Sequence, residues 1–151
     1  MTTVSGLEGL KGISGQGIGE SEWLEITQDR INKFADATGD HQWIHVDEAK
    51  AKAGPFGKTI AHGYLTLSLL PMLTSGLLKV QGVKMGINYG LNKLRYPAPV
   101  PVGSRVRALV RNLSVEEVGG GAAQVINEVT IQVEGQEKPS LVAETLTRYY
   151  F

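Results

Sequence analysis

The stretch IAHGYLTLSLLPMLTSGLLKV, residues 60–80, decides the fold. Only His62 and Lys79 in it can carry a charge, so its length and apolarity approach those of a membrane-spanning helix. Hydroxyl, proline and glycine residues interrupt it, however, and the strands predicted after it are amphipathic. We therefore expect a helix buried at the centre of a soluble domain. Pro71 should bend or shorten that helix, because it lacks an amide hydrogen and crowds the preceding turn.

The chain after this stretch alternates apolar and polar side chains with the period of half-buried strands. In residues 105–111 and 124–133, valines, isoleucines and alanines alternate with charged and amide residues. Two more long strands are expected over residues 85–94 and 141–150, and a short one over residues 23–26. The pattern predicts an α+β fold, in which an antiparallel sheet of about five strands is covered by the apolar helix.

Two shorter helices are predicted before the apolar stretch. Thr27 is placed to cap a helix over residues 28–38, where apolar side chains recur at helical spacing, and Gly39 supplies its end. Asp47 is expected to cap a second helix over residues 48–53. The chain between these helices therefore contains a bend.

The bulk composition limits the classes of protein that fit. The 151 residues suit one domain, 1–151, in which residues 1–21 are polar, punctuated by glycines and expected to form a loosely packed arm. Fifteen basic and fifteen acidic residues cancel, which argues against a general nucleic-acid-binding protein. The chain has no cysteine, and its N-terminus does not resemble a secretory signal, so we expect a cytoplasmic protein.

The charges are distributed unevenly along the chain. No Asp or Glu lies between Glu48 and Glu116. All of the following basic residues do: Lys50, Lys52, Lys58, Lys79, Lys84, Lys93, Arg95, Arg105, Arg107 and Arg111. A surface built from them would suit a small anionic ligand. The alternative is that they are solvated side chains whose acidic partners come from other parts of the chain.

The segment Gly39-Asp40-His41-Gln42-Trp43-Ile44-His45 holds the residues best suited to chemistry. At the spacing of Asp40 and His45, a helix places side chains about 140° apart and a strand places them on opposite faces. A bend after Gly39 can instead bring the carboxylate and the imidazole together around one water molecule. We expect a proton-transfer site here, although either residue alone is more often a turn or packing residue.

A metal site is a competing interpretation, since Asp40, His41, His45 and Asp47 lie close in the sequence. His41-Gln42-x-x-His45 differs from the zinc-protease helix, because Gln42 stands where a Glu would act as general base. The segment is also not clearly helical. We therefore expect no metal.

The whole pattern resembles the MaoC-like (R)-specific enoyl-CoA hydratases, the hydratase 2 family, which have the hot-dog fold. The resemblance is carried by Gly39-Asp40-x4-His45-Val46-Asp47, by Ile60-Ala61-His62-Gly63 and by the turn Pro99-Val100-Pro101-Val102-Gly103. It extends from about Trp23 to the C-terminus. The family motif commonly has Asn-Pro where this chain has Gln42-Trp43, a departure that keeps the acid and the histidine but can change the loop and one wall of the acyl pocket.

The resemblance implies an enzyme of fatty acid metabolism that hydrates a 2-enoyl thioester of coenzyme A or acyl carrier protein. The product would be a (3R)-hydroxyacyl thioester, and coenzyme A would be part of the substrate rather than a cofactor. Asp40 and His45 would activate one water, while the backbone N–H of Gly63 would bind the developing enolate oxygen. Ser68 and His62 could support this pair. A homodimer joined edge to edge through its sheets is also implied.

The residues that would contact the substrate are less well defined by the sequence. The candidates for the acyl group, the pantetheine arm and the phosphates are Trp43, Asn88, Tyr89, Lys93 and Arg95. Those on strands are equally consistent with ordinary sheet surface.

Two other functions fit the same fold. A hot-dog acyl-CoA thioesterase would use a carboxylate near a helix N-terminus to direct water at the thioester carbonyl. A non-catalytic acyl-CoA-binding or assembly subunit would need a partner chain to complete its site. Asp40 and His45 occur in one chain, which favours a self-sufficient enzyme.

Overall fold

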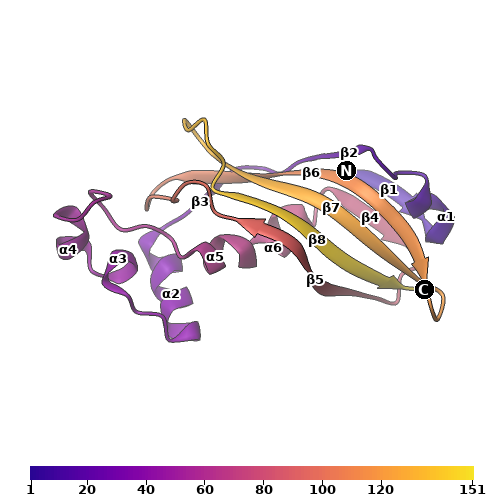
Figure 1. Ribbon diagram of the computed structural model, residues 1–151, viewed down its shortest axis with the longest axis horizontal. Coiled ribbons are helices and arrows are strands. Elements are labelled where there is room, and N and C mark those ends of the chain that lie inside the picture. The colour runs from indigo at the N-terminus through magenta and orange to yellow at the C-terminus, as the bar shows by residue number, and fades with distance from the viewer.

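A curved antiparallel sheet forms the body of the computed structural model, which describes residues 1–151 (Figure 1). Its strands run in the order β2-β6-β7-β8-β5, and β3 also pairs with β6. The long strands are β5 (Met85–Arg95), β6 (Arg105–Val118), β7 (Ala122–Val133) and β8 (Leu141–Tyr150), and the short ones are β2 (Gly17–Glu20) and β3 (Leu24–Glu25). The five strands predicted from the sequence are confirmed, and β2 is an addition.

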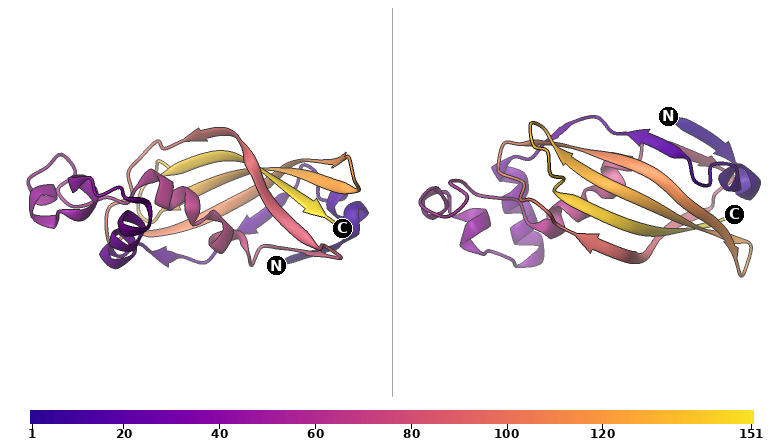
Figure 2. Two further views of the ribbon diagram at one scale, coloured as in Figure 1. Left: turned by 90° about the horizontal axis from the view of Figure 1, so that it is seen from below. Right: turned by 45° about the horizontal axis from the view of Figure 1, so that its top comes forward.

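The apolar stretch lies against the concave face of this sheet as two short helices, α5 (Gly63–Ser68) and α6 (Leu70–Thr74) (Figures 1 and 2). Pro71 occupies the first turn of α6, where its missing amide hydrogen breaks no helical bond, so the predicted shortening is confirmed. A single long helix is wrong in length. The end of the stretch extends instead as strand β4 (Leu78–Gln81).

The main core lies between α5–α6 and the sheet. Leu65, Leu69, Leu70 and Leu73 of the helices are buried against inward-facing strand residues. Those strand residues are Val106, Ala108 and Val110 of β6, Val129, Ile131 and Val133 of β7, and Leu141 and Ala143 of β8. Full burial of one such leucine or valine contributes about 1.5–3 kcal/mol, so this cluster is what holds the helices on the sheet.

The N-terminal residues are folded, and the expectation of a loosely packed arm is wrong. Strand β1 (Thr2–Ser5) pairs in parallel with β4, and helix α1 (Gly6–Lys11) follows it. Leu10 and Ile13 are buried in a second apolar cluster with Ala123 and Val125 of β7. Three-residue spacing places Leu10 and Ile13 on one side of the chain, and burial of that side overrides the glycine-rich composition.

Three helices project beyond the other end of the sheet: α2 (Gln28–Thr38), α3 (Trp43–Val46) and α4 (Glu48–Lys52) (Figure 1). The predicted caps are confirmed, because Thr27 accepts a hydrogen bond from the Arg30 amide and Asp47 accepts one from the Lys50 amide. A helical turn at α3 was not expected. None of the helices has the length and apolarity needed to cross a membrane.

Candidate active site

Asp40 follows directly on the end of α2. Gly39 adopts a left-handed conformation, with φ of 79°, and its amide donates to the Ala35 carbonyl at 2.8 Å. This closes the helix and turns the chain, as glycine commonly does at this position. The Asp40 side chain is exposed, and one of its oxygens accepts a hydrogen bond from the Gln42 amide at 3.3 Å. The carboxylate is thereby held at the mouth of the bend.

His45 lies in α3 and is only 7% exposed. Its Nδ1 lies 2.7 Å from the Ile60 carbonyl oxygen, so Nδ1 carries the hydrogen and donates it. Nε2 is then unprotonated and free to accept a proton. Burial lowers the pKa of His45 below its ordinary value of 6.5, and the neighbouring His62 lowers it further, while the bond to Ile60 and the Asp40 charge oppose the shift.

His62 completes a cluster with Asp40 and His45. A carboxylate oxygen of Asp40 and one ring nitrogen from each histidine lie within 4.8 Å of one another. His62 is 2% exposed, its ring stacks on that of His45 with centroids 3.8 Å apart, and its Nε2 donates to the Asp40 carbonyl oxygen at 2.9 Å. His62 Nδ1 is buried without a partner. Atoms at this spacing can be bridged by a single water molecule.

Gly63 begins α5 directly after His62. Its amide donates to no backbone carbonyl, as expected at the first position of a helix, so it is available to an anionic oxygen. The Tyr96 ring lies against this glycine, since a β-carbon added to Gly63 would be 3.0–3.1 Å from three ring atoms. We refer to Asp40, His45, His62 and Gly63 as the acid–histidine corner.

Gln28 ties the corner together, a role that the sequence did not indicate. Its amide nitrogen donates to the His45 carbonyl at 2.8 Å and to the Asn32 side chain at 2.9 Å, and its oxygen accepts from the Thr59 hydroxyl. One side chain of α2 therefore holds both α3 and the segment that leads into α5. The contacts link residues 17 and 31 positions apart, which no local pattern reveals.

The donors of the corner do not form the predicted alternative, a zinc helix. His41 points to Asp36, with 2.9 Å between its Nε2 and the carboxylate, and not to His45. The absence of a metal stays a prediction, because Asp40, His45 and His62 each offer a ligand atom and these atoms lie within 4.8 Å of one another.

Two residues proposed as support or pocket wall have other contacts. The Ser68 hydroxyl donates to the Tyr64 carbonyl of its own helix at 2.7 Å rather than to Asp40. Trp43 packs against Gly54, and its indole ring lies 4.8 Å from the Lys50 ammonium group. Both are near the corner in sequence, but neither touches the Asp40 carboxylate.

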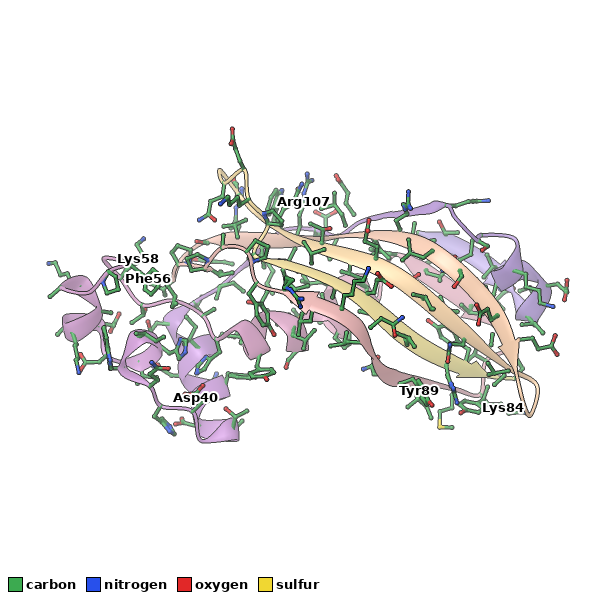
Figure 3. All side chains as sticks on the ribbon, in the orientation of Figure 1. Asp40, Phe56, Lys58, Lys84, Tyr89 and Arg107 are labelled. Carbon is green, nitrogen blue, oxygen red and sulfur yellow. The ribbon has the colours of Figure 1, made fainter.

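The other candidate substrate contacts lie on β5. Asn88 lines a cavity between the helices and the sheet, while the Arg148 guanidinium stacks 3.5 Å from the Tyr89 ring centroid. Lys93 pairs with Glu144, and Arg95 donates to the Leu94 carbonyl. Figure 3 shows Tyr89 far from Asp40 along the length of the molecule, so Tyr89 does not join the corner within one chain.

The acid-free basic segment does not form one positive surface. Arg105 pairs with Glu134, Arg107 pairs with Glu20, and Lys93 pairs with Glu144, so acids from outside the segment neutralise three of its ten basic residues. Figure 3 places Arg107 and Lys84 on different parts of the molecule. The second of the two interpretations, solvated side chains with distant partners, therefore describes these pairs.

Comparison with known proteins decides the family. Residues 11–134 match the MaoC like domain. The chain belongs to the MaoC-like family. It is 55% identical to 3-hydroxyacyl-thioester dehydratase Z of Mycobacterium tuberculosis over 99% of both chains.

Solved structures agree with this family and its fold. The (R)-hydratase PhaJ1 from Pseudomonas aeruginosa is 25% identical, with a TM-score of 0.67 over 89% of this chain and 79% of that one. A monoamine oxidase regulatory protein from Archaeoglobus fulgius is 24% identical, with a TM-score of 0.82 over 98% and 95% of the two chains. The predicted hot-dog fold is confirmed.

Proposed function

We propose that this MaoC-like protein is a hydro-lyase that adds water reversibly to a trans-2-enoyl-CoA and forms the (3R)-hydroxyacyl-CoA. The proposal is carried by one observation: a carboxylate oxygen of Asp40 and a ring nitrogen of His45 lie within 4.8 Å of each other, in a cluster whose third member, His62, directly precedes the helix start at Gly63. The 55% identity to a protein named 3-hydroxyacyl-thioester dehydratase supports the same chemistry.

The acid–histidine corner supplies a base for the water. His45 Nε2 takes the proton as the water oxygen bonds to C3, and the Asp40 carboxylate accepts the second hydrogen of the water and orients it. His62 is a positioning residue, because its bond to the Asp40 carbonyl and its stacking on His45 fix both groups. General acid–base help of this kind is typically worth ~10²- to 10⁴-fold.

As the water oxygen bonds to C3, the electron pair of the C2=C3 double bond shifts towards the thioester. Negative charge therefore accumulates on the thioester oxygen. The Gly63 amide is the donor for that oxygen, since it begins α5 and has no backbone partner. The Asp40–His45 pair then returns a proton to C2 from the same face, which gives syn addition and one enantiomer. Hydration in D₂O should therefore leave deuterium at C2 on the face that carries the new hydroxyl.

Incubation with crotonyl-CoA tests the reaction. Loss of the enoyl absorbance without release of free thiol is the result expected for a hydratase. Release of free coenzyme A thiol would instead identify the thioesterase. Binding of crotonyl-CoA with neither change would identify a non-catalytic acyl-binding subunit. Acyl carrier protein thioesters, assayed in parallel, show which carrier is used.

The active protein is proposed to be a homodimer joined through β5. This strand is at the edge of the sheet, so one row of its backbone groups is unpaired over Met85–Arg95. It also exposes Met85, Ile87 and Tyr89, each by 40% or more. Sedimentation of the wild-type protein should give a dimer, and Ile87→Lys should shift it towards the monomer.

The proposed reaction uses no resident cofactor or metal, because side-chain proton transfer and a backbone amide supply the chemistry. Activity that survives dialysis against a chelator is the expected result. The proposed compartment is the cytoplasm, which cell fractionation can check.

A further inference from the structure

A row of polar side chains runs diagonally across the concave face of the sheet. Asn112 of β6 pairs with Asn127 of β7, and Asn127 pairs with Thr145 of β8. On β8 the next inward position is Thr147, which pairs with Asn88 of β5. We refer to these five side chains as the polar row.

The polar row separates two apolar clusters. On one side lie Val110, Val129 and Ala143, which belong to the core around α5–α6. On the other side lie Val125 and Tyr149, which pack with the N-terminal helix. Inward positions of a sheet that is covered by helices are normally apolar, so neighbouring polar residues on adjacent strands need a partner.

The row borders a cavity of about 730 Å³ between the sheet and α5–α6. Asn88, Asn127, Thr145 and Thr147 line it from the sheet side, and Ser68 and Thr74 line it from the helices. An acyl pocket for plain hydrocarbon chains would be lined predominantly by apolar side chains. Here only ten of the twenty lining residues are hydrophobic, and both the sheet and the helices contribute polar ones.

Much of the hydrogen-bonding capacity of this lining is unused within the protein. The Asn127 oxygen accepts from Asn112 at 2.9 Å, which leaves both amide hydrogens of Asn127 without a partner in the protein. The side chains of Asn88 and Thr147 make no hydrogen bond within the protein. Ser68 and Thr74 donate to their own helix, so their oxygens can still accept. The sheet side can therefore donate to a ligand oxygen, and the helix side can accept from a hydroxyl.

We propose that this cavity selects 2-enoyl thioesters whose acyl chain carries a hydroxyl or oxo oxygen on its distal part. The inference rests on the proposed function, because that function places a thioester at Gly63. A plain alkyl chain would displace water from the polar row and leave its donors unpaired, whereas an oxygen substituent would accept from them.

The helix gives the position of that oxygen along the chain. Ser68 lies about 7.5 Å along α5 from Gly63, at about 1.5 Å per residue, and Thr74 lies in α6, where the same rise gives at most about 16 Å. An extended chain covers about 1.2 Å per bond, so the oxygen lies about six to thirteen bonds from the thioester carbon. Suitable probes are 8-hydroxy-2-octenoyl-CoA and 12-hydroxy-2-dodecenoyl-CoA, each paired with the unsubstituted chain.

Steady-state kinetics of the full-length protein test the proposal. The kcat/KM for at least one hydroxylated probe should exceed that for its unsubstituted partner by about tenfold, the order expected for one buried hydrogen bond. Hydration of crotonyl-CoA, which is too short to reach the row, tests the proposed function separately. If crotonyl-CoA is hydrated but both unsubstituted chains react as fast as the hydroxylated ones, the proposal is wrong and the proposed function stands.

Two variants test which side chains cause the preference for the hydroxylated chain. Thr147→Val removes a hydroxyl that the fold does not use, and Asn88→Leu removes an amide, so each should reduce the preference for the hydroxylated chain several-fold. Thr130→Val is the matched control, because it changes a β7 threonine beside the inward-facing Val129 and Ile131, on the opposite face of the sheet. Unchanged preference in both row variants, or an equal loss in Thr130→Val, would overturn the assignment.

Discussion

The acid–histidine corner and the polar row both contain buried or half-buried polar groups, but their partners differ. In the corner, each histidine ring is fixed by one hydrogen bond to a backbone carbonyl, His45 to Ile60 and His62 to Asp40, and Gln28 binds the His45 carbonyl. In the row, the amide hydrogens of Asn127 and the side chains of Asn88 and Thr147 have no partner in the protein. The corner is built before substrate arrives, as catalysis requires, whereas the row is completed by what enters.

The largest expected effect comes from removing the chemistry of the corner without its fold. Asp40→Asn and His45→Gln should each reduce kcat for crotonyl-CoA hydration by about 10²- to 10⁴-fold, because each group acts mainly in the transition state. Circular dichroism should stay as in the wild type. Wild-type turnover in either variant would show that the corner does not carry the chemistry. The contrast between a catalytic corner and a substrate-binding row would then be wrong.

A smaller loss is expected when Tyr96 is displaced from Gly63. Gly63→Ala puts a β-carbon 3.0–3.1 Å from the Tyr96 ring, so the ring or the helix start must shift, and kcat/KM should fall about ten- to a hundredfold. The double variant Gly63→Ala with Tyr96→Leu should recover part of the rate. No recovery would show that the glycine is needed for substrate approach itself and not for packing.

The pH dependence reports on the buried imidazole. Water activation needs neutral His45, and burial lowers its pKa, so kcat/KM for hydration should decrease only as the pH falls through a value below 6.5. A pH–rate profile measures this limb. The residual activity of His45→Gln should lack it, and a limb above 6.5 would contradict the assignment.

Replacing His62 should change the pH at which the acid limb of the pH–rate profile appears. In His62→Gln an amide can still donate to the Asp40 carbonyl, but the neighbouring ring that lowers the pKa of His45 is gone, so the limb should shift upward towards 6.5. The rate at neutral pH should fall less than in His45→Gln. An unchanged limb would reduce His62 to a packing residue.

The smallest effect concerns the turn that carries Asp40. Gly39→Ala places a side chain at φ of 79° and should lower the free energy of unfolding by about 1 kcal/mol. Gly76→Ala is the control, since Gly76 has no positive φ and open space around it. In thermal unfolding, the melting temperature of Gly39→Ala should be about 2–4 °C below that of Gly76→Ala.

Local patterns in the sequence predicted most of the fold and the reacting pair. Thr27 and Gly39 mark the ends of α2 through local capping chemistry, and the alternation in β6 and β7 reports which face is buried. Asp40 and His45 are on one bend, so their meeting required only that bend. Their proximity is confirmed, and their roles stay predictions.

The remaining features depend on contacts between distant segments. His62 meets the Asp40 carbonyl across 22 residues, and the polar row exists only because the strand registers align its members. The glycine-rich composition of the N-terminus gave no sign of helix α1, which is stabilised by burial of Leu10 against β7. Neither periodicity nor capping reports such contacts, because they depend on the tertiary arrangement.

The hydrogen bonds that Gln28 makes to His45 and Thr59 affect how the active site responds to heating. Helix α3 has four residues and cannot persist in water on its own, so His45 depends on contacts from outside α3, among them the Gln28 amide that joins α2, α3 and Thr59. Loosening that junction would release the base while the strands remain paired. Thermal inactivation should therefore begin at a lower temperature than the loss of strand signal, and faster amide exchange at α3 should accompany it.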